Sequence, residues 1–155
     1  MKKSMIQWVQ IVFLIGCLVL GGLSAPSWGA NGDLINAARA GDLVRVKSLI
    51  AAGADVNAKN EYGYTALLLA SSKGRVEVVR TLLAAKANVN ATDKQGDTAL
   101  MSASYSGHIE VVRALLAAKA DVNAKDNLDF TALRWASHGG HVEVVKLLRQ
   151  AGARE

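Results

Sequence analysis

The sequence predicts an all-α fold with short hairpin links, in which four helix-turn-helix repeats stack into a solenoid. The stretch from Thr65 to Ala91 returns 33 residues later, from Thr98 to Ala124, with 19 of its 27 positions identical. A third copy begins at Thr131. Within each copy the apolar residues recur at helical spacing. A fixed period of this length is typical of units that bury their apolar faces only against a neighbouring unit.

Residues 1–30 are predicted to form a secretory signal peptide. The lysines at positions 2 and 3 precede an apolar run at 11–23 and a tail with small residues at 24–30. A basic start, an apolar core and such a tail are typical of exported proteins. We expect cleavage between residues 25 and 30 and a periplasmic location for the mature protein.

Two alternatives for this segment stay open. Residues 14–17, LIGC, are similar to the lipobox of bacterial lipoproteins, in which case Cys17 would become an acylated amino terminus. The apolar run extended back to Ile6 reaches the length of about 20 residues that spans a bilayer, so it could also remain as an uncleaved anchor. Both alternatives again place the rest of the chain in the periplasm, but attached to a membrane.

The repeat domain is predicted over residues 31–155, with units at 31–59, 60–92, 93–125 and 126–155. The first unit lacks the hairpin that opens the others, and Asp33 is expected to cap a helix from Leu34 to Ala40. Arg45 stands where later units carry valine, and Arg149 stands where earlier units carry isoleucine or leucine. Because each end of a stack has one face without a neighbour, these two arginines are predicted to cap the array.

Each complete unit is predicted to contain two short helices. In the second unit the apolar residues place the first helix near Ala66–Ala70 and the second near Val76–Leu83. Gly74 is expected to end the first helix in a left-handed conformation. Glycine recurs at the equivalent position of every unit, and we call such a set of equivalent positions a column. A turn-rich link at 87–98 then leads to the next unit.

The repeated pattern D-x-x-G-x-T-A-L-x-x-A-x-x-x-G-H-x-E-V-V-x-x-L-L-x-x-x-A-D-V-N-A resembles the ankyrin repeat over residues 31–155. The resemblance implies a stack in which variable turn and first-helix positions line a concave groove. The family's T-P-L-H is TALL, TALM or TALR here, so its proline and histidine are absent. Lys86 and Lys119 stand where the family prefers glycine, so each is predicted to adopt a positive φ at a cost of about 1 kcal/mol.

Composition argues against several kinds of chemistry. The net charge of +5 falls to +3 without the two leader lysines, from 16 basic and 13 acidic residues, which is too small and too mixed for a nucleic-acid surface. Cys17 is the only cysteine, so the folded part has no thiolate metal site. His108 and His141 are expected to be structural, and two glycines separate His138 from His141. We therefore expect no catalysis, no cofactor and no metal.

The candidate binding residues vary between units in the turn and first-helix columns. All aromatic residues after the leader fall in such columns, and tyrosine and tryptophan are enriched in binding hot spots. An alternative for Trp135 and Phe130, that they fill gaps between units, stays open. The predicted protein-binding residues are Arg39, Tyr62, Tyr64, Lys73, Asp97, Tyr105, Phe130, Arg134, Trp135 and His138.

These observations predict an exported, monomeric and non-catalytic protein that binds an unidentified protein through its groove. The basic residues beside the aromatic ones suggest a partner surface that is apolar with some acidic character. No contact with nucleic acid is expected, and none with a membrane unless Cys17 is lipidated. The alternative function is a protective or structural accessory of a periplasmic enzyme or toxin, similar to an immunity protein, that recognises no defined epitope.

Overall fold

The computed structural model describes residues 27–154. Most of the predicted signal peptide, with the apolar run and Cys17, lies outside the described residues. The described part contains α2 (Ser27–Ala40), α3 (Leu43–Ala51), α4 (Ala66–Ser72), α5 (Val76–Ala84), α6 (Ala99–Tyr105), α7 (Ile109–Ala117), α8 (Ala132–His138) and α9 (Val142–Gln150). Among these helices none is both long and apolar enough to cross a bilayer.

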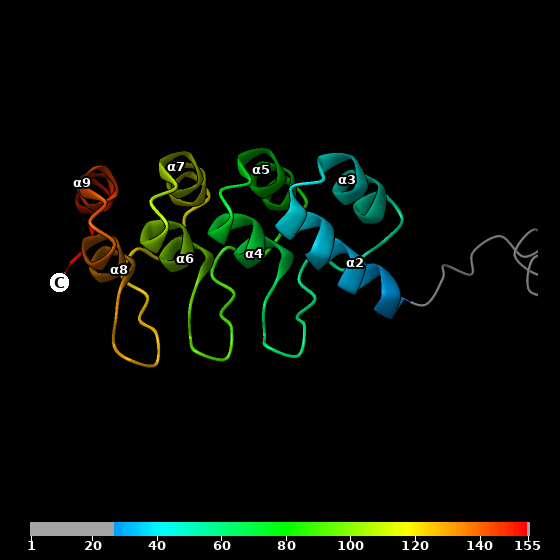
Figure 1. Ribbon diagram of the computed structural model, residues 1–155, viewed down its shortest axis with the longest axis horizontal. Helices are drawn as coiled ribbons and strands as arrows, with labels where there is room; N and C mark the ends of the chain where they lie inside the picture. The colour runs from blue at the N-terminus through cyan, green and yellow to red at the C-terminus, as the bar shows by residue number, and fades with distance from the viewer. Residues whose placement is uncertain (1–26, 155) are drawn as a thin grey trace, which may run out of the picture.

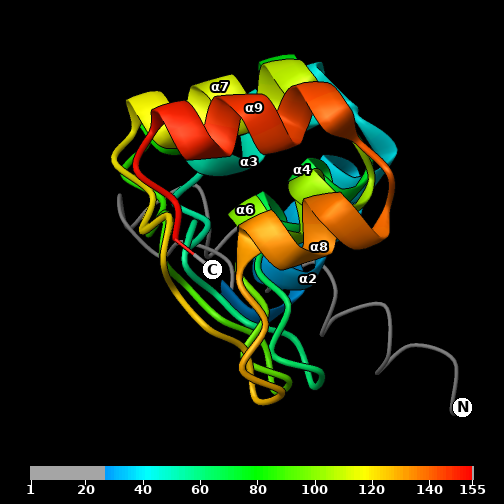
Figure 2. The same ribbon diagram turned by 90° about the vertical axis from the view of Figure 1, so that its left-hand side faces the viewer.

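The helices form two rows, and the predicted all-α repeat solenoid is confirmed. The inner helices α2, α4, α6 and α8 lie side by side, and the outer helices α3, α5, α7 and α9 form the second row (Figure 1). Hairpin-like links project from the inner row in one direction, and Figure 2 shows them one behind another along the stack. We call the surface formed by the inner helices and these links the groove face. The core is continuous along the stack, because each inner helix buries leucine and alanine against its neighbours.

The inner helices α4, α6 and α8 begin at threonine caps. The side-chain oxygens of Thr65, Thr98 and Thr131 each accept a hydrogen bond from the amide three residues later, at 3.2 to 3.3 Å. Such a bond satisfies one of the amide groups that a helix leaves without a partner in its first turn. These helices therefore start at the expected place without the proline of the family pattern.

The first unit differs from the prediction. Helix α2 begins at Ser27, within the interval predicted for cleavage, so Asp33 lies inside the helix and does not cap it. Because the helix continues upstream, amides around Asp33 find carbonyl partners within it and need no cap. The Asp33 carboxylate lies 3.3 Å from the Arg45 guanidinium instead. Both Arg45 and Arg149 are exposed, as predicted for residues at the two ends of the stack.

Several residues adopt the left-handed conformation. Lys86 and Lys119 have φ of 68° and 63°, which confirms the prediction made from the family's preference for glycine at these positions. Asp129, with φ of 61°, was not anticipated. It stands in the hairpin column that glycine fills in the two preceding units. The three residues show that this repeat tolerates side chains at positions where positive φ usually favours glycine.

Side chains at two repeated positions bind the backbone of neighbouring units. The asparagine of each Val-Asn pair accepts a hydrogen bond from an amide of the next unit, at 2.7 to 2.9 Å; these are Asn57, Asn90 and Asn123. The Nε2 of His108 bonds the carbonyl of Ser72 at 3.2 Å, and the Nε2 of His141 bonds the carbonyl of Tyr105 at 2.8 Å. The predicted structural role of these two histidines is therefore confirmed.

Candidate functional site

Four rings gather on the groove face where the third and fourth units meet. The Trp135 ring lies 5.5 Å from that of Tyr105, at an interplanar angle of 83°, and 5.2 Å from that of Phe130. The His138 ring stacks on Tyr105, with centroids 6.3 Å apart and planes at 18°. We call these four residues the ring cluster. They come from α6, α8 and the link before α8, so only the stacking of two units brings them together.

A buried carboxylate fixes the orientation of the tryptophan in this cluster. The Nε1 of Trp135 donates a hydrogen bond to Oδ2 of Asp126 at 2.9 Å. The other oxygen of Asp126 accepts bonds from the amides of Leu128 and Phe130, at 2.8 and 2.9 Å. Asp126 was not among the predicted site residues. Its column was a usable signal, because Asn60 and Asp93 occupy it and bind the hairpin amides in the same way.

A hollow of about 400 Å³ opens beside the ring cluster. We call it the groove hollow, and its lining residues are Ser72, Asp97, Met101, Ser102, Tyr105, Ser106 and Trp135. Asp97, Tyr105 and Trp135 belong to the predicted set, and the structure brings these three together. Tyr105 is 51% exposed, whereas Trp135 is partly buried. Trp135 therefore both fills space between units and forms a wall of the hollow.

The carboxylate of Asp97 is left without a partner. It makes no hydrogen bond or ion pair with any residue in the described part of the chain, while the Asp97 amide donates to Oδ1 of Asp93 at 2.9 Å. Burial raises the pKa of the Asp97 carboxyl above its ordinary value, and the carboxylates of Asp93 and Asp126 raise it further. The groove hollow therefore contains a carboxylate, and none of the other residues that line it is basic.

The remaining predicted residues lie apart from this hollow. Tyr62 and Tyr64 pair with each other, with centroids 5.9 Å apart, on the hairpin of the second unit. The Arg134 guanidinium carbon lies 3.7 Å from the centroid of the Phe130 ring, and Arg134 does not line the groove hollow. Arg39 and Lys73 are exposed on earlier units and do not line it. The ten predicted residues thus form more than one group.

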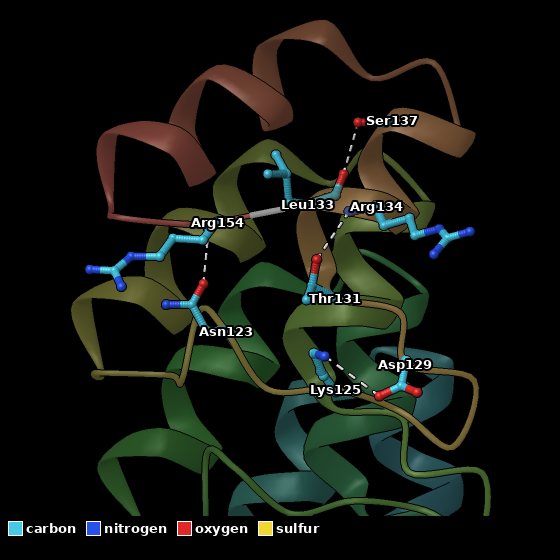
Figure 3. A pocket seen from close by; sticks show the side chains of 8 residues that line it. All are labelled: Asn123, Lys125, Asp129, Thr131, Leu133, Arg134, Ser137 and Arg154. Atoms are coloured by element: carbon cyan, nitrogen blue, oxygen red, sulfur yellow. Dashed lines mark hydrogen bonds and ion pairs between the residues drawn. The ribbon is translucent and has the colours of Figure 1, made fainter.

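A larger hollow of about 800 Å³ lies at the end of the stack (Figure 3). Its lining residues are Asn123, Lys125, Asp129, Thr131, Leu133, Arg134, Ser137 and Arg154. In Figure 3 the guanidinium groups of Arg134 and Arg154 point away from each other, and Lys125 lies 3.5 Å from Asp129. Its cations do not converge on one point, so despite its size this hollow is a weaker candidate for a binding site than the groove hollow.

The titratable residues give no further centre. No three of the histidine, cysteine, aspartate and glutamate residues between 27 and 154 lie together in a way that could hold a metal ion. The Nε2 of His141 is occupied by the Tyr105 carbonyl, and His138 contributes its ring to the cluster. The histidines therefore take part in packing and in backbone contacts.

Comparison with known protein families gives two adjoining matches. A family model described as ankyrin repeats (3 copies) matches residues 34–126, and a model described as ankyrin repeat matches residues 128–154. No curated protein matches the chain. The family matches cover all three units whose residues line the groove hollow.

Proposed function

Because the chain belongs to the ankyrin repeat family, whose repeats generally mediate protein–protein interaction, we propose that it is a non-catalytic module that binds a partner protein through its groove face. The observation that carries this proposal is the ring cluster beside the groove hollow. Tyr105 exposes 51% of its surface there, next to the rings of Trp135 and His138. Exposed, clustered aromatic residues of this kind are enriched among those that contribute most to binding energy.

The ring cluster is also suited to binding because it is already ordered. Trp135 is fixed by its hydrogen bond to Asp126, and Tyr105 packs against Trp135 and His138. A partner that docks here immobilises few additional side chains, and each such side chain would otherwise cost about 0.5–1.5 kcal/mol. The groove face therefore offers a large aromatic contact area at a low entropic cost.

The proposal is tested by comparing a groove variant with a variant on the outer helices. The partner is first purified together with the chain from its native source, and its affinity is then measured. Tyr105→Ala should weaken partner binding by more than about 1 kcal/mol. The matched control is Arg113→Glu, because Arg113 lies exposed on α7 in an ion pair of 3.6 Å with Glu110. This control should bind normally.

If Arg113→Glu weakened partner binding and Tyr105→Ala did not, the partner would dock on the outer helices. Equal binding by both variants and the wild type would favour an accessory that shields its partner without a defined epitope. Loss of the Tyr105 ring contacts should also lower the free energy of unfolding by about 1 kcal/mol. Circular dichroism of each variant is therefore used to check that the fold is kept.

We further propose that the protein is exported to the periplasm. The basic start, apolar run and small-residue tail before residue 31 support this location. Mass spectrometry of the mature amino terminus should find a chain that begins between residues 26 and 31. A terminus at an acylated Cys17 would instead support a lipoprotein, and an intact Met1 in a soluble cytoplasmic fraction would contradict export.

A further inference from the structure

We propose that the groove hollow takes a cationic side chain of the partner, a lysine or an arginine, between the carboxylate of Asp97 and the rings of Tyr105 and Trp135. This inference rests on the proposed function, because the cation is carried by the protein that docks on the groove face. It adds the chemical character of the contact in the groove hollow.

The geometry supplies two kinds of attraction for a cation. Tyr105 and Trp135 are nearly perpendicular, at 83° with centroids 5.5 Å apart, so they form two adjoining walls of the hollow. A lysine ammonium or arginine guanidinium is attracted to the face of such rings. Asp97 lines the same hollow and provides a formal negative charge beside them. The uncharged remainder of the lining is suited to the aliphatic stem of the entering side chain.

Neighbouring carboxylates show why Asp97 is available to a ligand. Asp93 and Asp126 each direct Oδ1 at two amides of their own hairpin, so these groups are structural. Asp97 instead has no bond from its carboxylate to any described residue. Burial and the two neighbouring carboxylates make its charged form unfavourable in the free protein, which appears as a raised pKa. A cation in the groove hollow would relieve this cost.

Lys125 of the third unit and Arg134 of the fourth unit each have a partner other than Asp97. Lys125 pairs with Asp129 at 3.5 Å, and Arg134 lies over the Phe130 ring. Neither residue lines the groove hollow. The expectation of a partly acidic partner rested on basic residues that include Arg134, which the structure places at the end of the stack. The groove hollow therefore favours a basic contact.

The inference can be tested without the partner, by NMR titration of the full-length chain with blocked tripeptides, acetyl-Gly-X-Gly-amide. The residue X is arginine, lysine, citrulline or glutamate, and citrulline has nearly the shape of arginine without its charge. The indole signal of Trp135 is identified by its loss in Trp135→Phe. The arginine and lysine peptides should shift this signal in a saturable way, at concentrations on the order of millimolar. The citrulline and glutamate peptides should bind at least about fivefold more weakly.

Two variants that change the net charge equally provide the decisive comparison. Asp97→Asn should lower the affinity for the arginine peptide about fivefold or more, because the local carboxylate charge is lost. Glu143→Gln, at an exposed position of the outer helix α9, should leave the affinity unchanged. Backbone amide spectra of both variants show whether each one is folded.

The outcomes separate this inference from the proposed function. Equal affinity of the arginine and citrulline peptides, equal effects of the two variants, or no peptide binding would each overturn the cationic contact. The proposed function would still stand if Tyr105→Ala weakened binding of the protein partner. The proposed function would be contradicted if Tyr105→Ala left partner binding intact.

Discussion

The third and fourth units contain the same two helices, yet equivalent positions have different environments. Met101 and Ser104 on α6 are buried to 1% and 0% exposure, whereas Arg134 and Ser137, 33 residues later on α8, are exposed. The difference arises because α8 covers α6, while no described unit covers α8. Burial in this fold therefore depends on the next unit as much as on the residue itself, which is the expected behaviour of a stack held by contacts between neighbours.

The hairpins of the two units show the same effect. A side chain added at Gly96, where φ is +83°, would place its Cβ 3.0 Å from the amide nitrogen of Asn127 in the following hairpin. Asp129 occupies the same column in the last unit, with φ of 61° and a largely exposed side chain. Glycine is thus required by the following unit in the interior and is replaceable at the end.

The largest expected difference in unfolding free energy between interior and end positions of the stack comes from substitutions in the core. Leu115→Ala, at a fully buried position of α7, should lower the free energy of unfolding by about 2–5 kcal/mol. Val142→Ala, at a position of α9 that is 79% exposed, should change it by less than about 0.5 kcal/mol. Urea unfolding measures both values. Similar losses at the two positions would contradict a stack whose stability comes from burial between units.

A second pair of variants tests the hairpin columns. Gly96→Ala should cost about 2–4 kcal/mol, because it combines strain at positive φ with the close approach of the Asn127 backbone. Asp129→Ala should cost about 1 kcal/mol, since it removes an exposed ion pair with Lys125 and places alanine at a positive φ that aspartate tolerates better. Thermal unfolding of both variants provides the measurement. A smaller loss for Gly96→Ala than for Asp129→Ala would show that the hairpins do not pack as described.

The serine column predicts a gain in stability from an interior substitution. The hydroxyl of Ser104 is buried without a hydrogen-bond partner in the structure, whereas the hydroxyl of Ser137 donates to the carbonyl of Leu133 at 2.9 Å. Ser104→Ala removes the cost of an unsatisfied buried group and should raise the free energy of unfolding by about 1 kcal/mol. Ser137→Ala should have no such benefit, and chemical denaturation of the two variants side by side tests this contrast.

The smallest expected effect concerns Asp97, whose column carries Phe130 in the last unit. The pKa of Asp97 is higher in the folded protein than in the unfolded chain. Ionisation of Asp97 therefore lowers the free energy of unfolding progressively as the pH rises through the folded-state pKa. Asp97→Asn should therefore be more stable than the wild type at pH 7, by less than about 1 kcal/mol for this partly exposed group. The difference should vanish below the ordinary aspartate pKa of 3.8. A pH series of thermal unfolding curves, with Glu143→Gln as the control, would reveal the opposite sign if Asp97 were stabilising.

The prediction for Asp33 shows where local sequence signals were insufficient. An aspartate before an apolar helix is a good capping signal, but the same signal is present when the helix begins further upstream. Helix α2 begins at Ser27, so Asp33 pairs with Arg45 instead. Whether a capping residue is used depends on which amides lack partners, and this is decided by the whole helix.

The sequence by itself determined the features that repeat. The 33-residue period, the helix positions and the positive φ of Lys86 and Lys119 follow from columns in which each unit has the same backbone requirement. Polar residues in normally apolar columns likewise predicted that Arg45 and Arg149 cap the stack, and both residues are exposed. Local backbone geometry and burial on a repeated face require the same residue types at the same position of every unit. These features could therefore be predicted from one sequence.

Only the tertiary structure decided which of the variable residues meet. Columns give the position of a side chain within its unit, but not its direction once a neighbouring ring or carboxylate competes for the same space. The bond from Trp135 to Asp126 turns the indole toward Tyr105, and the Phe130 ring holds Arg134 at the end of the stack. These contacts join different units or lie several residues apart, and they do not repeat along the chain. For that reason the sequence indicated the aromatic residues of the groove face, while their arrangement around Asp97 depended on packing between two particular units.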